Sequence, residues 1–279
     1  MPELPEVETV VRDLRPLLMG QSIGGVLAGK KKLRSGKIGR WILTLEGDQF
    51  SAVRRRGKWI ILELASGRCL LVHLGMTGQL KVMNAREGVE SHTHLRMELA
   101  GVEKELRYRD IRRFGWLELF ASAEELASYF CSMKLGLEPW EASPEYFQEK
   151  LQNSQRPVKN LLLDQEILAG VGNIYADESL FESRLHPRKK GKSLSREDVE
   201  KLLKAVQRVL TRAISHRGST LRNYVGGTGL KGGFQNEFQV YGREGEACPV
   251  CSKAVERIVL AGRSAHYCPI CQPSPKGRS

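Results

Sequence analysis

Four cysteines near the end of the chain form two pairs, and their spacing constrains the fold more than any other feature. Two residues separate Cys248 from Cys251 and Cys268 from Cys271, and sixteen residues lie between the pairs. This spacing is typical of a zinc site in which two short knuckles bring four thiolates around one ion. Because all four ligands would be protein side chains, we expect one structural Zn²⁺ and neither a catalytic metal nor a redox cofactor. Two disulfides or inert cysteines are the alternative interpretation.

The residues between the two pairs are predicted to form a β-hairpin. Ile258, Val259 and Leu260 precede an Ala-Gly-Arg turn at 261–263, which places Arg263 at the tip. A segment this small cannot bury enough apolar surface to fold alone, so metal binding is expected to supply folding free energy. A phosphate contact is the favoured role for Arg263, and a solvated side chain is the alternative.

The chain carries a net charge of +12, which indicates a polyanionic partner. Lysines and arginines cluster in four short stretches, at residues 30–40, 54–58, 107–113 and 184–192. A folded chain could gather these stretches on one face, so nucleic acid, the commonest polyanion, is the expected partner. A basic surface that only maintains solubility is the alternative.

The other two cysteines, Cys69 and Cys131, lie far from the pairs, which favours a metal site in a reducing compartment over a disulfide framework. The sequence shows no apolar run of membrane-spanning length and no secretory signal pattern. We therefore expect a cytoplasmic protein.

The pattern of apolar residues predicts an α+β multidomain fold. Residues 5–18 have the periodicity of an amphipathic helix. Short β-like runs follow, at 41–45, 49–54, 59–64, 69–74, 93–99 and 115–120, and they suggest a sandwich or a barrel. We assign an N-terminal β-sandwich with its helix to residues 1–135, a helical helix–two-turn–helix domain to 136–233 and a zinc-finger hairpin to 234–279.

Helix-start signals appear after residue 121. Ser122 with Glu125 and Ser195 with Asp198 resemble capping boxes. Two further start signals are Ser143 before Pro144 and Pro157 before Val158, because proline is preferred in the first turn of a helix. The glycine-rich residues 226–233 are expected to form a loop that folds over a bound base, or otherwise a featureless linker.

The first residues, Met1-Pro2-Glu3, are the most specific chemical signal. If Met1 is removed, Pro2 becomes an N-terminal secondary amine, and an α-amine titrates near neutrality. Such an amine can attack a sugar C1′ and form a Schiff base, while Glu3 moves protons. Taken alone, the same residues could be an ordinary entry into a helix.

Several motifs together resemble the formamidopyrimidine-DNA glycosylase family. The motifs follow the family's order along nearly the whole chain: the opening Pro-Glu-Leu-Pro-Glu-Val-Glu-Thr, Arg55-Arg56-Gly57-Lys58, His73-Leu74-Gly75-Met76-Thr77-Gly78, Asp110-Ile111-Arg112-Arg113-Phe114-Gly115, Gly170-Val171-Gly172-Asn173-Ile174-Tyr175-Ala176, and Val240-Tyr241-Gly242-Arg243. No single motif is specific, but their combination is.

The resemblance implies roles for the residues that match catalytic positions of the family. Pro2 would be the nucleophile and Glu3 an acid/base at the sugar. Lys58 would donate a proton in β-elimination and contact phosphate, although it could be only one more exposed cation. Arg263 would serve δ-elimination and grip phosphate near the lesion.

The resemblance also implies a monomer that associates with the nucleoid and binds damaged double-stranded DNA, and it implies roles in DNA binding for several residues. His92, Arg112 and Lys159 match DNA-contact positions, and Asn173 would cap the second helix of the helix–two-turn–helix, whose N-terminus suits phosphate. Met76, Arg112 and Phe114 match residues that fill the gap left by a flipped nucleotide; we call these three the wedge residues. An enzyme that acts on a base inside a duplex needs such a plug, although Met76 and Phe114 could also be core residues. His92 and His94 could suggest a metal pair, but solvated positions on an exposed strand are expected.

The sequence departs from the family pattern in four places. Ile111 replaces a usual proline, Ala265 follows Ser264 where Ser-Thr is usual, and Ser252 replaces a common glycine. The glycine loop is slightly long, which puts the details of base recognition in doubt. None of these changes removes a proposed catalytic group.

The resemblance predicts a bifunctional glycosylase and AP lyase that excises 8-oxoguanine or formamidopyrimidines and cleaves the strand by β,δ-elimination. An endonuclease VIII-like enzyme for oxidised pyrimidines is the nearest alternative; Leu4 and the Arg-Arg-Phe sequence at 112–114 favour the purine branch. The other two alternative functions are those of a non-catalytic zinc protein that binds nucleic acid and of an inactive paralogue.

Overall fold

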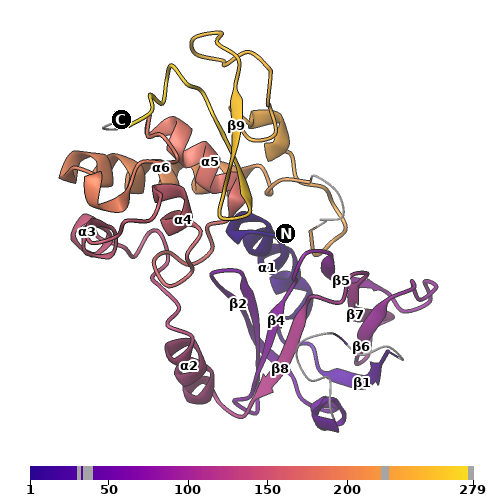
Figure 1. Cartoon of the computed structure of the whole chain (residues 1–279). Helices are drawn as coiled ribbons and strands as arrows, with labels where there is room; N and C mark the ends of the chain where they lie inside the picture. The colour runs from indigo at the N-terminus through magenta and orange to yellow at the C-terminus, as the bar shows by residue number, and fades with distance from the viewer. Residues whose placement is uncertain (30–32, 34–39, 221–225, 276–279) are drawn as a thin grey trace. The chain divides into compact units, whose positions relative to one another are not determined.

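The computed structural model describes residues 1–29, 33, 40–220 and 226–275. The chain divides into two compact units, residues 1–133 with 214–235 and residues 134–213 with 236–279, and each unit is described by itself (Figure 1). Most of the basic stretch at 30–40 lies outside the described residues. No helix among the described residues is both long and apolar enough to cross a membrane.

The first unit begins with helix α1 (Leu4–Leu18), which confirms the predicted N-terminal helix. Glu3 and Glu6 form a capping box at its start, where Pro5 occupies the first turn. Val7, Leu14 and the other apolar residues of one helix face are buried in the core that the helix shares with the β-strands.

Two antiparallel four-stranded sheets make up most of the first unit. One sheet has the order β2 (Phe50–Arg56), β3 (Trp59–Leu64), β4 (Cys69–His73) and β8 (Trp116–Phe120), and the other has the order β1 (Ile23–Ala28), β6 (Thr93–Leu99), β7 (Lys104–Asp110) and β5 (Gly78–Asn84) (Figure 1). Buried residues of both sheets and of α1 belong to one apolar cluster. The predicted β-sandwich with an N-terminal helix is therefore confirmed.

Strand prediction failed where polarity or glycine hid the pattern. Residues 41–45 are not a strand but part of a 3₁₀ helix, η1 (Arg40–Leu45). Strands β1, β5 and β7 were not predicted. Strand β1 contains two adjacent glycines, and β7 places Glu105 and Arg107, two charged residues, in the buried interior. The ion pair between those two side chains makes their burial tolerable, but a single sequence does not show it.

His94 is buried, so the expectation of a solvated histidine was wrong. The pairing of β6 with β7 shifts register between Thr93 and Leu95, and this β-bulge places His94 and Leu95 both inside. The His94 side chain is 1% exposed, and its Nε2 lies 2.9 Å from the carbonyl oxygen of Asp110. A bulge breaks strict alternation, which is the pattern on which the prediction relied.

The remaining elements are mainly helical. They are α2 (Ala123–Ser132), α3 (Pro144–Gln152), α4 (Val158–Leu162), α5 (Asn173–Glu182), η2 (Gly191–Ser193), α6 (Arg196–Ser215) and η3 (Phe234–Glu237), followed by the hairpin strands β9 (Glu256–Leu260) and β10 (Arg263–Tyr267). The hydroxyls of Ser122, Ser143 and Ser195 each accept a backbone N–H at a helix start, as predicted.

The two compact units do not coincide with the three predicted domains, which are 1–135, 136–233 and 234–279. Residues 214–235 belong to the first unit, where Arg217 bonds Asp13 at 2.7 Å and Ser219 bonds Glu6 at 2.7 Å. The zinc-finger hairpin belongs to the same unit as the helices that precede it. The boundaries of the three predicted domains therefore remain a prediction from the sequence.

Candidate functional site

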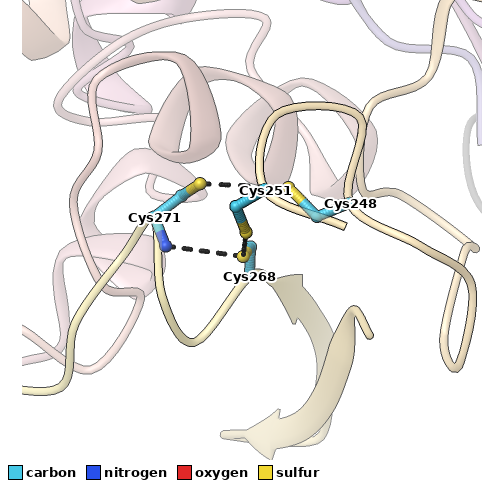
Figure 2. Close-up of side chains that lie close together, drawn as sticks. All are labelled: Cys248, Cys251, Cys268 and Cys271. Atoms are coloured by element: carbon cyan, nitrogen blue, oxygen red, sulfur yellow. Dashed lines mark hydrogen bonds between the residues drawn. The ribbon is translucent and has the colours of Figure 1, made fainter. Parts of the chain in front are cut away.

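The four paired cysteines come together in the second unit, as the spacing predicted. One ligand atom from each of Cys248, Cys251, Cys268 and Cys271 lies within 4.8 Å of the others (Figure 2). The sulfurs of Cys251 and Cys268 are 3.3 Å apart and those of Cys248 and Cys271 are 3.9 Å apart. Tetrahedral Zn–S bonds of about 2.3 Å require sulfurs about 3.8 Å apart. The donor set and its spacing therefore fit a zinc ion.

Backbone amides of the two knuckles favour the thiolate form of the ligands. The amide of Val250 donates to Cys248 Sγ at 3.5 Å, and that of Cys271 donates to Cys268 Sγ at 3.4 Å. Burial raises the pKa of the Cys248 thiol, but the N–H donors of Val250 and Cys251 outweigh it and lower that pKa to about 7. Burial and the neighbouring thiols instead raise the pKa of Cys268 and that of Cys271, the latter to about 12, so four thiolates can lie together here only around a cation.

Arg263 lies beside the turn of the zinc-finger hairpin, close to the predicted tip. Ala261 and Gly262 form the turn with φ angles of +46° and +75°, and this pair of positive values is typical of a two-residue type I′ hairpin. Arg263 is the first residue of β10, pairs with Leu260 and is exposed. It lines an open pocket of 390 Å³ within the second unit, together with Arg156, Asn160, Leu163, Asp164, Gln165, Leu260 and Ala261.

Pro2 and Glu3 are both buried at the start of α1. Glu3 is 3% exposed, and its backbone N–H donates to Glu6 Oε2 at 2.8 Å. The other carboxylate oxygen of Glu6 accepts the backbone N–H of Ser219 at 2.7 Å. The first helical turn therefore fixes the backbone at Pro2 and Glu3, the predicted nucleophile and the predicted acid/base.

Lys58 lies in the tight connection between β2 and β3 and is 7% exposed. The next residue, Trp59, packs its ring 4.7 Å from the ring of His73. His73 Nδ1 accepts the backbone N–H of Gly75 at 3.1 Å. Burial, and then the positive charge of Lys58, lower the pKa of His73 to about 4. A neutral imidazole beside the Lys58 ammonium is a feature that sequence reasoning missed.

The neutral state of His73 predicts a loss of stability in acid. Its pKa is about 4 in the folded protein and 6.5 ordinarily, so the unfolded chain takes up a proton first as the pH falls. The stability is fully present above pH 6.5 and is lost as the pH falls toward 4. Over that window the free energy of unfolding should fall by about 3 kcal/mol from this group.

Denaturant titrations of the wild type and His73→Gln between pH 7.5 and pH 4 measure this contribution. Glutamine keeps an acceptor for Gly75 but does not titrate, so its free energy of unfolding should depend less steeply on pH. Equal pH dependence of the two proteins would contradict the assignment.

The wedge residues lie on two loops of the first unit that the structure holds together. Buried Asp110 accepts the Thr77 hydroxyl at 2.5 Å and the Gly115 amide at 2.7 Å, which joins the loop of Met76 to that of Arg112 and Phe114. The two loops touch so closely that a Cβ on Gly75 would lie 2.6 Å from the Phe114 carbonyl carbon.

The wedge side chains themselves are partly exposed rather than buried in the core. Met76 is 42% exposed, and the Arg112 guanidinium lies over the Phe114 ring at 4.8 Å. This stacking forms a planar and apolar surface. Met76 is therefore not a core residue, which was the alternative interpretation.

His92 lies near the same loops. Its φ of +67° is in the left-handed region, and its carbonyl accepts the N–H of Asp110 at 3.0 Å. The ring is partly exposed, with Nδ1 3.1 Å from the Ser91 hydroxyl. His92 is accessible to a ligand, but its DNA contact remains a prediction.

Lys159 and Asn173 are placed differently from the expectation. Lys159 is completely buried and pairs with Asp177, at 2.5 Å between Nζ and Oδ1. Asn173 is the first residue of α5 and does not cap it, because Gly172 occupies the cap position without a side-chain bond. The Asn173 amide instead donates to the Ser264 hydroxyl at 3.3 Å. The capping prediction was therefore wrong, and direct DNA contacts of these two residues stay predictions.

Sequence reasoning missed several buried carboxylates. Glu6, Asp110 and Asp177 each bind several donors, and none is more than 2% exposed. Only Glu6 left a signal, as the third residue of a capping box that begins with Glu3. The others have long-range partners: Asp110 and Thr77 are 33 positions apart in the sequence, and Asp177 and His266 are 89 positions apart.

Comparison with protein-family models matches most of the chain. Residues 1–117 match the formamidopyrimidine-DNA glycosylase N-terminal domain, and residues 135–225 match the H2TH domain of the same glycosylase. Residues 245–273 match a zinc finger found in FPG and IleRS. The three matches follow the predicted order of modules.

Known proteins and solved structures resemble the chain over its full length. A formamidopyrimidine-DNA glycosylase of Bacillus cereus is 40% identical over 98% of this chain and 99% of its own. A mutant of Lactococcus lactis FPG, bound to DNA containing Fapy-dG, superposes with a TM-score of 0.91 at 37% identity, over 98% of this chain and 100% of its own. Wild-type Lactococcus lactis FPG bound to DNA containing an oxidized pyrimidine superposes with a TM-score of 0.90 at 37% identity, over 98% of this chain and 100% of its own.

Proposed function

Because the chain belongs to the formamidopyrimidine-DNA glycosylase family, we propose that this DNA glycosylase excises oxidised purines and then cleaves the strand as an AP lyase. The observation that carries the proposal is the position of Pro2 and Glu3, adjacent residues at the start of α1 whose backbone the capping box fixes. The Lactococcus lactis complex with a formamidopyrimidine lesion supports the purine class.

The proposed reaction uses the Pro2 nitrogen as nucleophile once Met1 has been removed. The lone pair attacks C1′, the N-glycosidic bond breaks, and the base leaves with the bonding electrons and takes up the proton that the Pro2 nitrogen then loses. Glu3 protonates O4′ as the sugar ring opens, which leaves an iminium between Pro2 and C1′. Loss of a C2′ proton then expels the 3′ phosphate (β-elimination), for which Lys58 is the proposed proton donor. A second elimination, assigned to Arg263, expels the 5′ phosphate, and water releases Pro2 from the sugar fragment.

Access to C1′ requires that the damaged nucleotide leave the stack. We assign the vacated space to the wedge residues Met76, Arg112 and Phe114, whose exposed surface suits insertion between bases. His92, Lys159 and Asn173 are proposed to help hold the DNA. One structural zinc would stabilise the hairpin that carries Arg263. A monomer acting at the nucleoid of the cytoplasm remains our prediction.

Oxidised pyrimidines are the second candidate substrate class. The observation that favours them is the Lactococcus lactis structure with a DNA that contains an oxidized pyrimidine. The two classes share the same Schiff-base chemistry, so only relative rates separate them.

A panel of duplexes tests the proposed function. Single-turnover cleavage should be fastest on 8-oxoguanine or formamidopyrimidine opposite cytosine, slower on thymine glycol and absent on undamaged DNA. Gel analysis of the ends should show phosphates at both sides of the gap, as β,δ-elimination requires. Preference for thymine glycol would favour the endonuclease VIII-like alternative. Binding without cleavage by a protein that has lost Met1 would favour a binding protein or an inactive paralogue.

A further inference from the structure

A buried ion pair in the second unit has no part in the proposed chemistry. Lys159 Nζ lies 2.5 Å from Asp177 Oδ1, and neither side chain is exposed to solvent. Removing both charges from water is costly unless the remaining hydrogen-bonding groups also find partners. Asp177 meets this condition, because its Oδ2 accepts the backbone N–H of His266 and lies 3.0 Å from the His266 ring nitrogen Nδ1.

Both members of the pair hold the same strand of the zinc-finger hairpin. Lys159, from α4, donates to the carbonyl oxygen of Ser264, and Asp177, from α5, accepts the N–H of His266. The bonded residues flank Ala265, which is completely buried. The Asn173 side chain, also from α5, adds a bond to the Ser264 hydroxyl. Helices α4 and α5 thus fix strand β10 at its second and fourth residues, Ser264 and His266.

Arg263 begins that strand and depends on its backbone for orientation. Its side chain is exposed, and within the described part of the chain no hydrogen bond or ion pair restrains the guanidinium. The type I′ turn and the pairing with Leu260 link Arg263 to β9, and the side chains of Lys159 and Asn173 bond Ser264, the next residue of the strand. A shift of β10 would move the guanidinium directly.

We propose that Asp177, acting through Lys159 and β10, is a positioning residue for Arg263. Asp177 does not contact DNA. It keeps Lys159 charged and aimed at the Ser264 carbonyl, and it anchors His266, so that Arg263 is presented at a fixed place for phosphate. The inference rests on the proposed function of Arg263. It gives Lys159 an indirect effect on DNA that does not require this buried ammonium to reach a phosphate.

A double-mutant cycle between Asp177→Asn and Arg263→Ala tests the proposal. Asparagine keeps the volume of Asp177 but removes the charge that balances Lys159. We expect Asp177→Asn to lower the rate of δ-elimination about 10-fold, with the β-product accumulating, while the borohydride adduct still forms. In the Arg263→Ala background the same substitution should have no further effect, because there is no guanidinium left to position.

Glu182→Gln is the matched control. It is the same carboxylate-to-amide change in the same helix, but it removes only surface ion pairs to Arg208 and Arg212. Its product ratio should equal that of the wild type. Zinc content and thermal unfolding are measured for every variant. If Asp177→Asn does not fold, the K159M/D177N double variant takes its place in the cycle, since it leaves no isolated buried charge.

Two results would overturn the proposal. One is a wild-type ratio of δ- to β-products in Asp177→Asn with zinc retained. The other is an equal fold-reduction by Asp177→Asn in the presence and absence of Arg263, which would show a general structural role. A wild-type protein that cleaves no lesion DNA would refute the proposed function itself, whereas these two results leave that function intact.

Discussion

A protein that keeps any residue in front of Pro2 should lose borohydride-trapped adducts completely and excise the damaged base at least about 10³-fold more slowly. The retained residue turns the secondary amine of Pro2 into an amide, whose lone pair is delocalised and does not attack C1′. The effect should be large because the nucleophile creates the intermediate on which every later step depends. The measurement is single-turnover excision of 8-oxoguanine opposite cytosine, with adducts trapped by borohydride in parallel.

Two further variants separate loss of the nucleophile from damage to the fold. Pro2→Gly keeps an N-terminal amine and should still be trapped, with the adduct mapped by peptide sequencing to residue 2. Glu3→Gln should keep the amine but slow excision by about 10²- to 10⁴-fold, since it removes a general acid/base. DNA affinity and thermal unfolding should match the wild type in the protein with the blocked amine. Full trapping by that protein, with the adduct mapped to a lysine and not to the α-amine of the retained residue, would mean that a lysine, not Pro2, is the nucleophile.

The sequence predicted those parts of the fold that depend on local signals. Helix α1, the serine caps and the zinc knuckles are each encoded by residues within a few positions of one another, so periodicity and spacing revealed them. The 3₁₀ helix at Arg40–Leu45 was mistaken for a strand because a short apolar run has no distinctive period. Strand β7 was missed because the charges of Glu105 and Arg107 are satisfied inside the protein.

The same distinction between local signals and long-range contacts applies to the candidate site. The positions of Pro2, Lys58, Arg263 and the wedge residues could be proposed from motifs, but the groups that hold them could not. Asp110 fixes the wedge loops through Thr77, and Asp177 fixes β10 through His266, in both cases across long stretches of sequence. A lone aspartate gives no sign of a distant partner. For the same reason the family motif predicts a DNA contact for Lys159 but does not reveal that its side chain is completely buried.

Removal of zinc should unfold the hairpin and abolish binding to lesion DNA, while the first unit keeps its structure. The hairpin region has little apolar core of its own: its buried cluster consists of Phe181 and Val240 with Val255 and the ligands Cys248 and Cys268. Without the ion, four thiols that prefer to be thiolates around a cation would lie close together, and about 10 kcal/mol or more of binding free energy would be absent. Strands β9 and β10 should then lose protection against amide hydrogen exchange.

The experiment compares chelator-treated protein with protein to which Zn²⁺ or Mg²⁺ is returned. Zn²⁺ should restore both protection and DNA binding, whereas Mg²⁺ should not, because it prefers oxygen ligands. The sandwich supplies none of the four ligands, so exchange in its strands should not change. Cys268→Ser, which removes a fully buried ligand, should reproduce the chelated state, and Cys131→Ser, an exposed cysteine outside the cluster, should not. A zinc-free protein, verified by metal analysis, that still protects β9 and β10 would show that contacts to α4 and α5, such as that of Asp177 with His266, suffice to hold the hairpin.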